Sequence, residues 1–82
     1  MKSFAALSRA GRAILGWSQA KLATRTGMAT ASVARIETGV INPRHNTVID
    51  IIKAFQSAGL EIDQHDIGGG FSISVDKSLF EE

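Results

Sequence analysis

The side chains best suited to catalysis or metal binding are few in this sequence and are poorly spaced for either task. His45 and His65 are the two histidines, and there is no cysteine. His65 has Asp63 and Asp66 as neighbours, but a stable metal site needs further imidazole or thiolate ligands close by, so we interpret this stretch as a solvated loop. The glycines at 68–70 lack both the spacing and the following helix of a phosphate-binding loop. With no nucleophile paired to a base, the sequence predicts no enzyme, no metal and no cofactor.

Charge is distributed unevenly, although the formal net charge of the 82 residues is only +1. Residues 1–60 hold eight Lys and Arg against two acidic residues, a net +6, whereas residues 61–82 carry a net −5. A basic body with an acidic end favours a polyanionic partner for the body, the alternative being that both sets of charges only hydrate the surface. Arg9 and Lys53 are interpreted as solvated cations. We expect a cytoplasmic protein, because no apolar run reaches membrane-spanning length and cysteine is absent.

The polar side chains that could contact a polyanion need helices to position them, and residues 18–37 predict two short ones. Leu22 lies on the inner face of the first helix at helical spacing. Gly27 then interrupts the pattern, since glycine adopts at little cost the positive φ with which helices often end. Val33 and Ile36, three residues apart, begin a second inner stripe. Two helices that meet at a tight turn form a helix-turn-helix, whose second helix can enter the major groove of DNA.

Four features of this segment follow one another in a fixed order. Ser18-Gln19 opens the first helix, Leu22-Ala23 lies inside it, Gly27 forms the turn, and Ile36-Glu37-Thr38-Gly39 closes the second helix. In this order they resemble the Cro/repressor-type (Xre-type) helix-turn-helix DNA-binding family, and the resemblance covers about residues 3 to 59. It implies a lambda-repressor-like domain of four or five helices that binds double-stranded DNA.

The resemblance also implies which residues contact DNA. Arg35 is the best candidate for reading a base, because a guanidinium can donate to O6 and N7 of guanine together; the alternative is a surface cation paired with a carboxylate or water. Ala31 is explained as well by its high helix propensity. The residues at or beside the base-reading positions of the family are Thr30, Ala31, Ser32 and Arg35. The candidate phosphate ligands are Ser18, Gln19, Arg12, Thr38, Asn42 and Arg44.

An ion pair between Arg12 and Glu37 is implied as well, since the family often joins an arginine of its first helix to a glutamate at the end of the recognition helix, here about residues 29–37. Such a pair would orient the recognition helix and leave an arginine N–H for a phosphate. Loss of one partner costs about 3–5 kcal/mol if the pair is partly buried, and about 0–1 kcal/mol if it is exposed.

Two helix starts depart from the family pattern. Ala29 stands where the family has a capping Ser or Thr, so either the first N–H groups are left to water or Thr30 caps a helix that begins one residue later. Arg44 stands where the family tends to have a Ser. We expect Asn42 to cap the fourth helix instead, with Pro43 at its first position, where no N–H donor is needed.

The rest of the sequence predicts three further elements. A helix over residues 3 to 15 has an apolar stripe, and a helix over about 44–58 closes the core. Alternating residues at 60–63 and 71–75 predict an antiparallel hairpin, which must pack on the helices or on a second subunit because an isolated hairpin is marginal in water. The apolar stripe of the first helix contains Phe4, Leu7, Ala10, Ile14 and Leu15.

These elements predict a mainly α fold, with a helix-turn-helix DNA-binding domain at 1–59 and a hairpin with an acidic tail at 60–82. We expect a transcriptional regulator, acting as a repressor associated with the nucleoid when bound. A homodimer would read half-sites about 34–36 Å apart, with the hairpin as the candidate dimer surface through its edge or its apolar face. The alternative is an antitoxin-like module whose C-terminal segment binds a partner protein. A helix-turn-helix used only as a scaffold is a further alternative.

Overall fold

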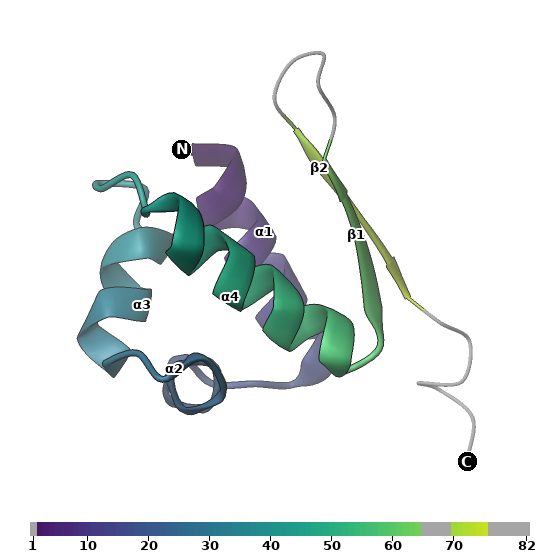
Figure 1. The fold of residues 1–82 in the computed structure, drawn as a ribbon, viewed down its shortest axis with the longest axis horizontal. Helices are drawn as coiled ribbons and strands as arrows, with labels where there is room; N and C mark the ends of the chain where they lie inside the picture. The colour runs from purple at the N-terminus through teal and green to yellow at the C-terminus, as the bar shows by residue number, and fades with distance from the viewer. Residues whose placement is uncertain (1, 65–69, 76–82) are drawn as a thin grey trace.

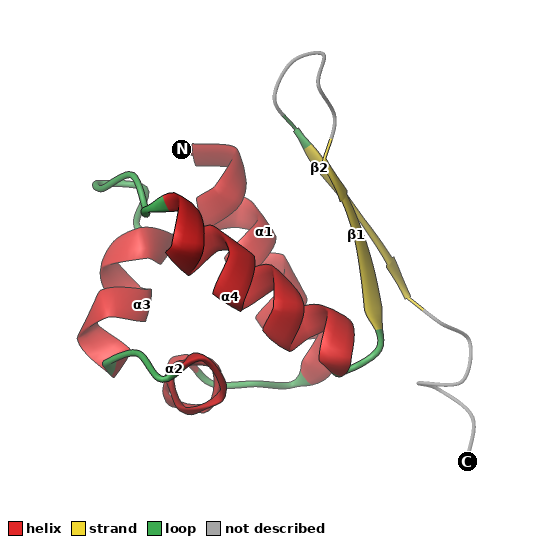
Figure 2. Ribbon diagram, in the orientation of Figure 1, coloured by secondary structure: helices red, strands yellow, loops and turns green. Residues whose placement is uncertain are grey.

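The computed structural model describes residues 2–64 and 70–75, and in this part of the chain four helices precede a two-stranded sheet (Figure 1). The helices are α1 (Lys2–Leu15), α2 (Gln19–Thr26), α3 (Thr30–Glu37) and α4 (His45–Ser57), and the strands are β1 (Leu60–Gln64) and β2 (Phe71–Val75). This confirms the mainly helical fold with a C-terminal hairpin (Figure 2). None of the described helices is long and apolar enough to cross a membrane.

Glycines end the first two helices, and a serine starts the second. Gly16 and Gly27 follow α1 and α2 with φ of 71° and 73°, in the left-handed region that other residues adopt only with strain. The Ser18 hydroxyl accepts the Lys21 N–H at 3.0 Å and caps α2. A sharp turn therefore separates α2 from α3, and the two helices pack against each other.

The structure shows which residue occupies the N-cap of α3 and which occupies the N-cap of α4. Ala29 occupies the N-cap of α3 with an extended backbone and no side-chain cap, so Thr30 is the first helical residue and not the cap. The prediction for α4 is wrong, because Arg44 and not Asn42 occupies its N-cap. Proline fixes only φ, so Pro43 suits an extended connection as well as the first turn of a helix.

The core lies where α1, α4 and the helix-turn-helix meet the start of the sheet. Gly11 allows α1 to approach α4 closely, since a Cβ built there would lie 2.7 Å from ring atoms of Phe55. The ring of Trp17 packs on the same phenyl group, with 6.0 Å between centroids. The largest fully buried apolar side chains are Phe4, Phe55, Leu22, Ile51, Leu60 and Val33.

The hairpin packs on the helices, as its marginal independent stability requires. β1 and β2 are antiparallel, with Ile62 opposite Ile73. β1 packs on α4 and β2 packs on α1, where the rings of Phe4 and Phe71 meet edge to face at 5.8 Å. In Figure 1 the hairpin lies on one side of α1 and α4, and α3 lies on the other side.

The buried face of α1 differs from the stripe that the sequence predicted. Ala10 is exposed and the Ile14 side chain is 39% exposed. Their expected places in the interior are taken by Ser8 and Gly11, which are both buried. Part of the apolar surface of α1 therefore lies outside the core, beside β2.

Candidate nucleic-acid interface

The outer face of α3 is open to solvent. Val33 and Ile36 are buried on the inner face of the helix, which packs mainly on α2 and α1. Figure 1 shows α3 at the edge of the molecule, with α1 and α4 between it and the hairpin. The exposed side carries Thr30, Ala31 and Arg35, with Ser32 half-buried beside them. Another molecule can therefore approach the short side chains of Thr30, Ala31 and Ser32 closely, while the longer side chain of Arg35 extends beyond them.

Glu37, the last residue of α3, is held by side chains from α1 and α2. Its side chain is only 3% exposed and forms an ion pair with Arg12, with 2.7 Å between Nη2 and Oε1. Nε of the same guanidinium donates to Oε2 at 2.8 Å and to Oε1 at 3.1 Å. The Ser8 hydroxyl donates to Oε2 at 2.6 Å, and the Gln19 amide donates to Oε1 at 3.2 Å. These four residues, which we call the Glu37 cluster, tie the end of α3 to α1 and to the start of α2.

The Glu37 cluster keeps its carboxylate ionised. Burial alone would raise the pKa of Glu37, but the hydrogen bonds from Arg12, Ser8 and Gln19 and the charge of Arg12 outweigh burial and hold this pKa below its usual value. The hydrogen bond to Glu37 in turn raises the pKa of Arg12. Both partners are therefore charged at neutral pH, and the negative charge is neutralised inside the protein.

Ser8 and Arg9 contribute to this region, although the sequence did not predict a contact of either residue with Glu37. Arg9, interpreted as a solvated cation, is exposed but donates from Nη1 to the backbone carbonyl of Glu37. The Thr38 hydroxyl donates to the carbonyl of Arg35 at 2.7 Å, so two carbonyls of the last turn of α3 have side-chain partners. The signal for Ser8 was its position four residues before Arg12, on the same face of α1.

The expected phosphate ligands fall into two groups. Arg12 already donates to Glu37 and, from Nη1, to the carbonyl of Trp17 at 3.0 Å. Ser18 accepts the capping bond of α2, and the amide nitrogen of Gln19 faces the Glu37 cluster. The other group lies exposed at the end of α3 and in the loop that follows, and consists of Thr38, Asn42 and Arg44.

Comparison with family models matches residues 9–62 to a helix-turn-helix family, that of the Cro/repressor (Xre) type. The match covers 54 of the 82 residues and contains α2, α3 and α4 in full. The chain belongs to this helix-turn-helix family. The family implies that the domain binds DNA, and α3 is the second helix of the motif. None of the curated proteins compared with the chain matches it.

The helix-turn-helix displays cations on its surface while its carboxylate is buried. Glu37 is the only acidic residue before Asp50 in the sequence, and its charge is enclosed by the Glu37 cluster. A polyanion that approaches this part of the domain is therefore attracted without meeting an exposed carboxylate. The exposed cations of α2, α3 and the loop before α4 are Lys21, Arg25, Arg35 and Arg44.

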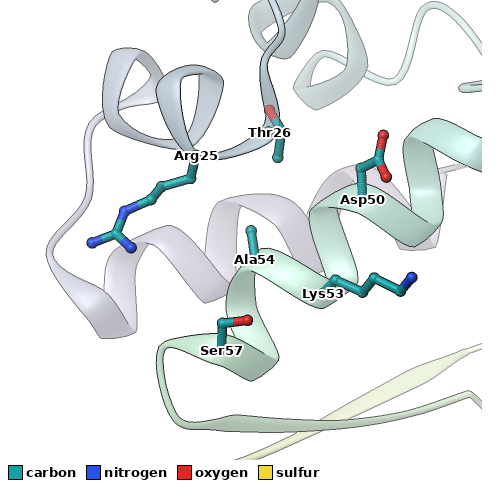
Figure 3. A pocket seen from close by; sticks show the side chains of 6 residues that line it. All are labelled: Arg25, Thr26, Asp50, Lys53, Ala54 and Ser57. Atoms are coloured by element: carbon teal, nitrogen blue, oxygen red, sulfur yellow. The ribbon is translucent and has the colours of Figure 1, made fainter.

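A polar pocket of about 280 Å³ lies between α2 and α4 and has no lining residue from α3. Figure 3 shows the Arg25 guanidinium and the Lys53 ammonium extending in opposite directions, with Asp50 on the side of Lys53. The Arg25 guanidinium carbon lies 5.1 Å from the centre of the Trp17 ring, in the geometry of a cation–π contact. The two cations do not converge on one ligand, and we assign this pocket no binding role.

Of the two histidines, the structure describes His45. His45 is exposed in the first turn of α4. Within the residues that the structure describes, no group of three or more His, Cys, Asp or Glu side chains could hold a metal ion. The interpretation of His65 and Asp66 as a solvated loop concerns residues outside the described ranges.

Proposed function

We propose that this protein is a transcriptional regulator that reads duplex DNA with α3. The observation that carries the proposal is the outer face of this helix, which is exposed and lies on the side of the molecule opposite the hairpin. The short side chains of Thr30, Ala31 and Ser32 would allow α3 to lie deep in the major groove, with methyl groups against thymine. Arg35 would donate to O6 and N7 of a guanine, the most specific contact on this surface.

Phosphate contacts would fix the register of α3 on either side of the groove. Thr38, Asn42 and Arg44 would contact one strand from the end of α3 and the following loop. Ser18 and Gln19 would contact the other strand at the start of α2, where free backbone N–H groups and the helix dipole favour an anion. We infer that Arg12 acts mainly by holding Glu37, because three of its N–H groups already have partners within the protein.

We further propose that the protein binds DNA as a homodimer and represses transcription. One domain covers a short site, and two domains related by a two-fold axis would read half-sites about 34–36 Å apart. Residues 1–59 would then bind DNA and residues 60–82 would join the subunits. Repression is the simplest outcome, because a bound dimer blocks access to the DNA beneath it. The antitoxin-like alternative depends on the segment after Gly59, and no observation on its described residues favours it.

Fluorescence anisotropy tests the reading surface, with a duplex selected from a random pool by the full chain. We expect Arg35→Ala to weaken binding to the best site by about 1–3 kcal/mol and to relax the preference at one base pair. Lys53→Ala is the matched control, since it removes one positive charge from α4, in the pocket that contains no α3 residue. The proposal fails if Arg35→Ala binds like the parent protein, or if Lys53→Ala loses as much affinity and selectivity.

A salt titration separates phosphate contacts from base contacts. Arg44→Ala should weaken binding to all duplexes alike and lower the slope of log K against log salt concentration by about 1. A loss of selectivity in this variant would instead assign Arg44 to base reading.

A further inference from the structure

We propose that two copies of this chain pair through the outer edges of β2, so that their hairpins form one four-stranded antiparallel sheet. The inference rests on the homodimer proposed above and names the surface that forms it. Among the described residues the sheet has only the order β1-β2, so each strand has one edge that faces away from its partner. The outer edges of β1 and β2 differ in how well each would pair with the same strand of a second chain.

The sequence of β2 is self-complementary about its central residue. In an antiparallel pair of identical strands centred on Ile73, Phe71 lies opposite Val75 of the second copy, and Ser72 lies opposite Ser74 of the second copy. Every cross-strand pair is then uncharged, and the apolar pairs are of the aromatic and β-branched kind that stabilises sheets. The strand also lacks the charges and prolines with which proteins usually protect an edge.

The sequence of β1 opposes the same pairing. A two-fold pair centred on Ile62 would place Glu61 opposite Asp63 of the second copy, and would do so twice. Both side chains are exposed, and like charges directly opposite each other destabilise a strand pair. On the described residues, β1 is therefore the edge protected against association, and β2 is the edge better suited to pair with a second copy.

An apolar groove beside β2 fits the strand that would be added. The groove has a volume of about 500 Å³ and lies between α1 and β2. Ala6, Ala10 and Ile14 form its α1 wall, Phe71 and Ile73 form its β2 wall, and no residue of β1 lines it. It therefore opens on the side of β2 where a third strand would lie. The second copy's β2 would cover the apolar part of α1 that the core leaves exposed, including Ile14.

The same pairing directs both recognition helices to one side of the dimer. The two-fold axis that relates two antiparallel strands in a sheet is perpendicular to that sheet, so both helical layers lie on the same face of the joined sheet. Since α1 and α4 separate α3 from the hairpin (Figure 1), both copies of α3 face away from the sheet in the same direction. A dimer that binds two half-sites on one duplex needs this arrangement.

Disulfide cross-linking of the full chain tests the register, because the sequence contains no cysteine. In the proposed dimer Ile73→Cys faces the same residue of the second copy, at a spacing that a disulfide can bridge. Ile62→Cys is a closely matched control, since Ile62 is also a half-buried isoleucine and lies opposite Ile73 within the hairpin. After mild oxidation we expect about tenfold more covalent dimer from Ile73→Cys than from Ile62→Cys.

A second variant keeps the test valid if the cysteine variant does not fold. Ile14→Glu puts a charge into the groove without entering the core of the subunit, and burying it unpaired should raise the dissociation constant of the dimer by about tenfold or more. Ile41→Glu is the matched control, since Ile41 is 43% exposed against 39% for Ile14 and does not line the groove. Sedimentation equilibrium measures both dissociation constants.

Three results would overturn the inference: a parent chain that stays monomeric, equal cross-linking of the two cysteine variants, or an Ile14→Glu variant that dimerises like the parent. The DNA-binding proposal is judged separately, by the effect of Arg35→Ala on the same preparations. If affinity still depends on Arg35 while the β2 contact fails, only the dimer surface is wrong. If the β2 dimer forms and Arg35→Ala has no effect, only the reading surface is wrong.

Discussion

Glu37 is a charged side chain in an environment that would ordinarily exclude one. Its side chain is 3% exposed, and an ion buried to this degree is costly unless it is paired and its hydrogen bonds are satisfied. Ser8, Arg12 and Gln19 supply those bonds from α1 and from the start of α2. Because the residue is the last of α3, the same bonds fix the position of the helix on the rest of the domain.

Glu37→Gln tests this role at nearly constant shape. The variant leaves Arg12 largely buried without its counter-ion and turns an amide NH₂ towards groups that are themselves donors. We expect the free energy of unfolding to fall by about 3 kcal/mol, as measured by urea denaturation at pH 7. Asp50→Asn makes the same chemical change at an exposed carboxylate. Similar losses in the two variants would show that the Glu37 cluster does not hold the domain together.

Stability should also depend on pH through Glu37. Its pKa in the folded protein is held below the usual value of a glutamate by the hydrogen bonds and the charge of the Glu37 cluster, so folding favours the ionised form. This contribution to stability is complete above the unfolded pKa and is lost as the pH falls through the folded pKa. Urea midpoints measured from pH 7 down to pH 3 should therefore decline less in Glu37→Gln than in the parent. Parallel declines would assign the acid sensitivity to other carboxylates.

At the residue scale, the sequence predicted the ion pair between Arg12 and Glu37 but not the other side chains that contact Glu37. The family resemblance implied that Arg12 and Glu37 meet, because both stand at positions of the family motif. The resemblance implied no role for Ser8 or Arg9, and their contacts with Glu37 depend on how α1 is rotated about its axis. The predicted apolar stripe included Ala10 and Ile14, which are exposed. The positions of the apolar residues alone therefore did not predict which face of α1 is buried.

Among the elements, α3 begins without a side-chain cap, as α4 does. Ala29 has the extended backbone of an N-cap residue, with φ −76° and ψ 145°, but no side-chain oxygen to accept a backbone N–H. Ala29→Ser supplies one, and we expect it to raise the free energy of unfolding by about 0.5–1 kcal/mol. Ala20→Ser is the control, because Ala20 is an exposed residue of α2, a helix that Ser18 already caps. Thermal unfolding measures both variants. A midpoint temperature of Ala29→Ser no higher than that of Ala20→Ser would contradict this expectation.

Element types followed from the sequence more readily than element boundaries. The alternation at 60–63 and 71–75 predicted the hairpin, because each strand presents one face to α1 or α4 and the other to solvent. The start of α4 was predicted at Pro43, but Arg44 takes the extended N-cap conformation with ψ 154°. Proline restricts one backbone dihedral and leaves the other to the surrounding packing, which the sequence does not describe.

In the whole molecule, the candidate DNA surface and the hairpin occupy opposite sides of the α1–α4 layer (Figure 1). The uneven charge of the chain anticipated a basic body, and the exposed cations of the helix-turn-helix agree with it. The sequence could not predict on which side the hairpin would pack, because that depends on Leu60 entering a core made by residues far from it in the chain. Under the two proposals made above, this separation would leave one face for DNA and the other for the contact between two subunits.

Amide chemical-shift mapping of the full chain, labelled with nitrogen-15 and titrated with its selected duplex, tests most directly whether α3 is the surface that binds DNA. We predict that the perturbed amides belong to the start of α2, to α3 and to residues 38–44, while the amides of β1 and β2 keep their positions. Shifts centred on the hairpin or on the pocket between α2 and α4, with the amides of α3 unmoved, would contradict it.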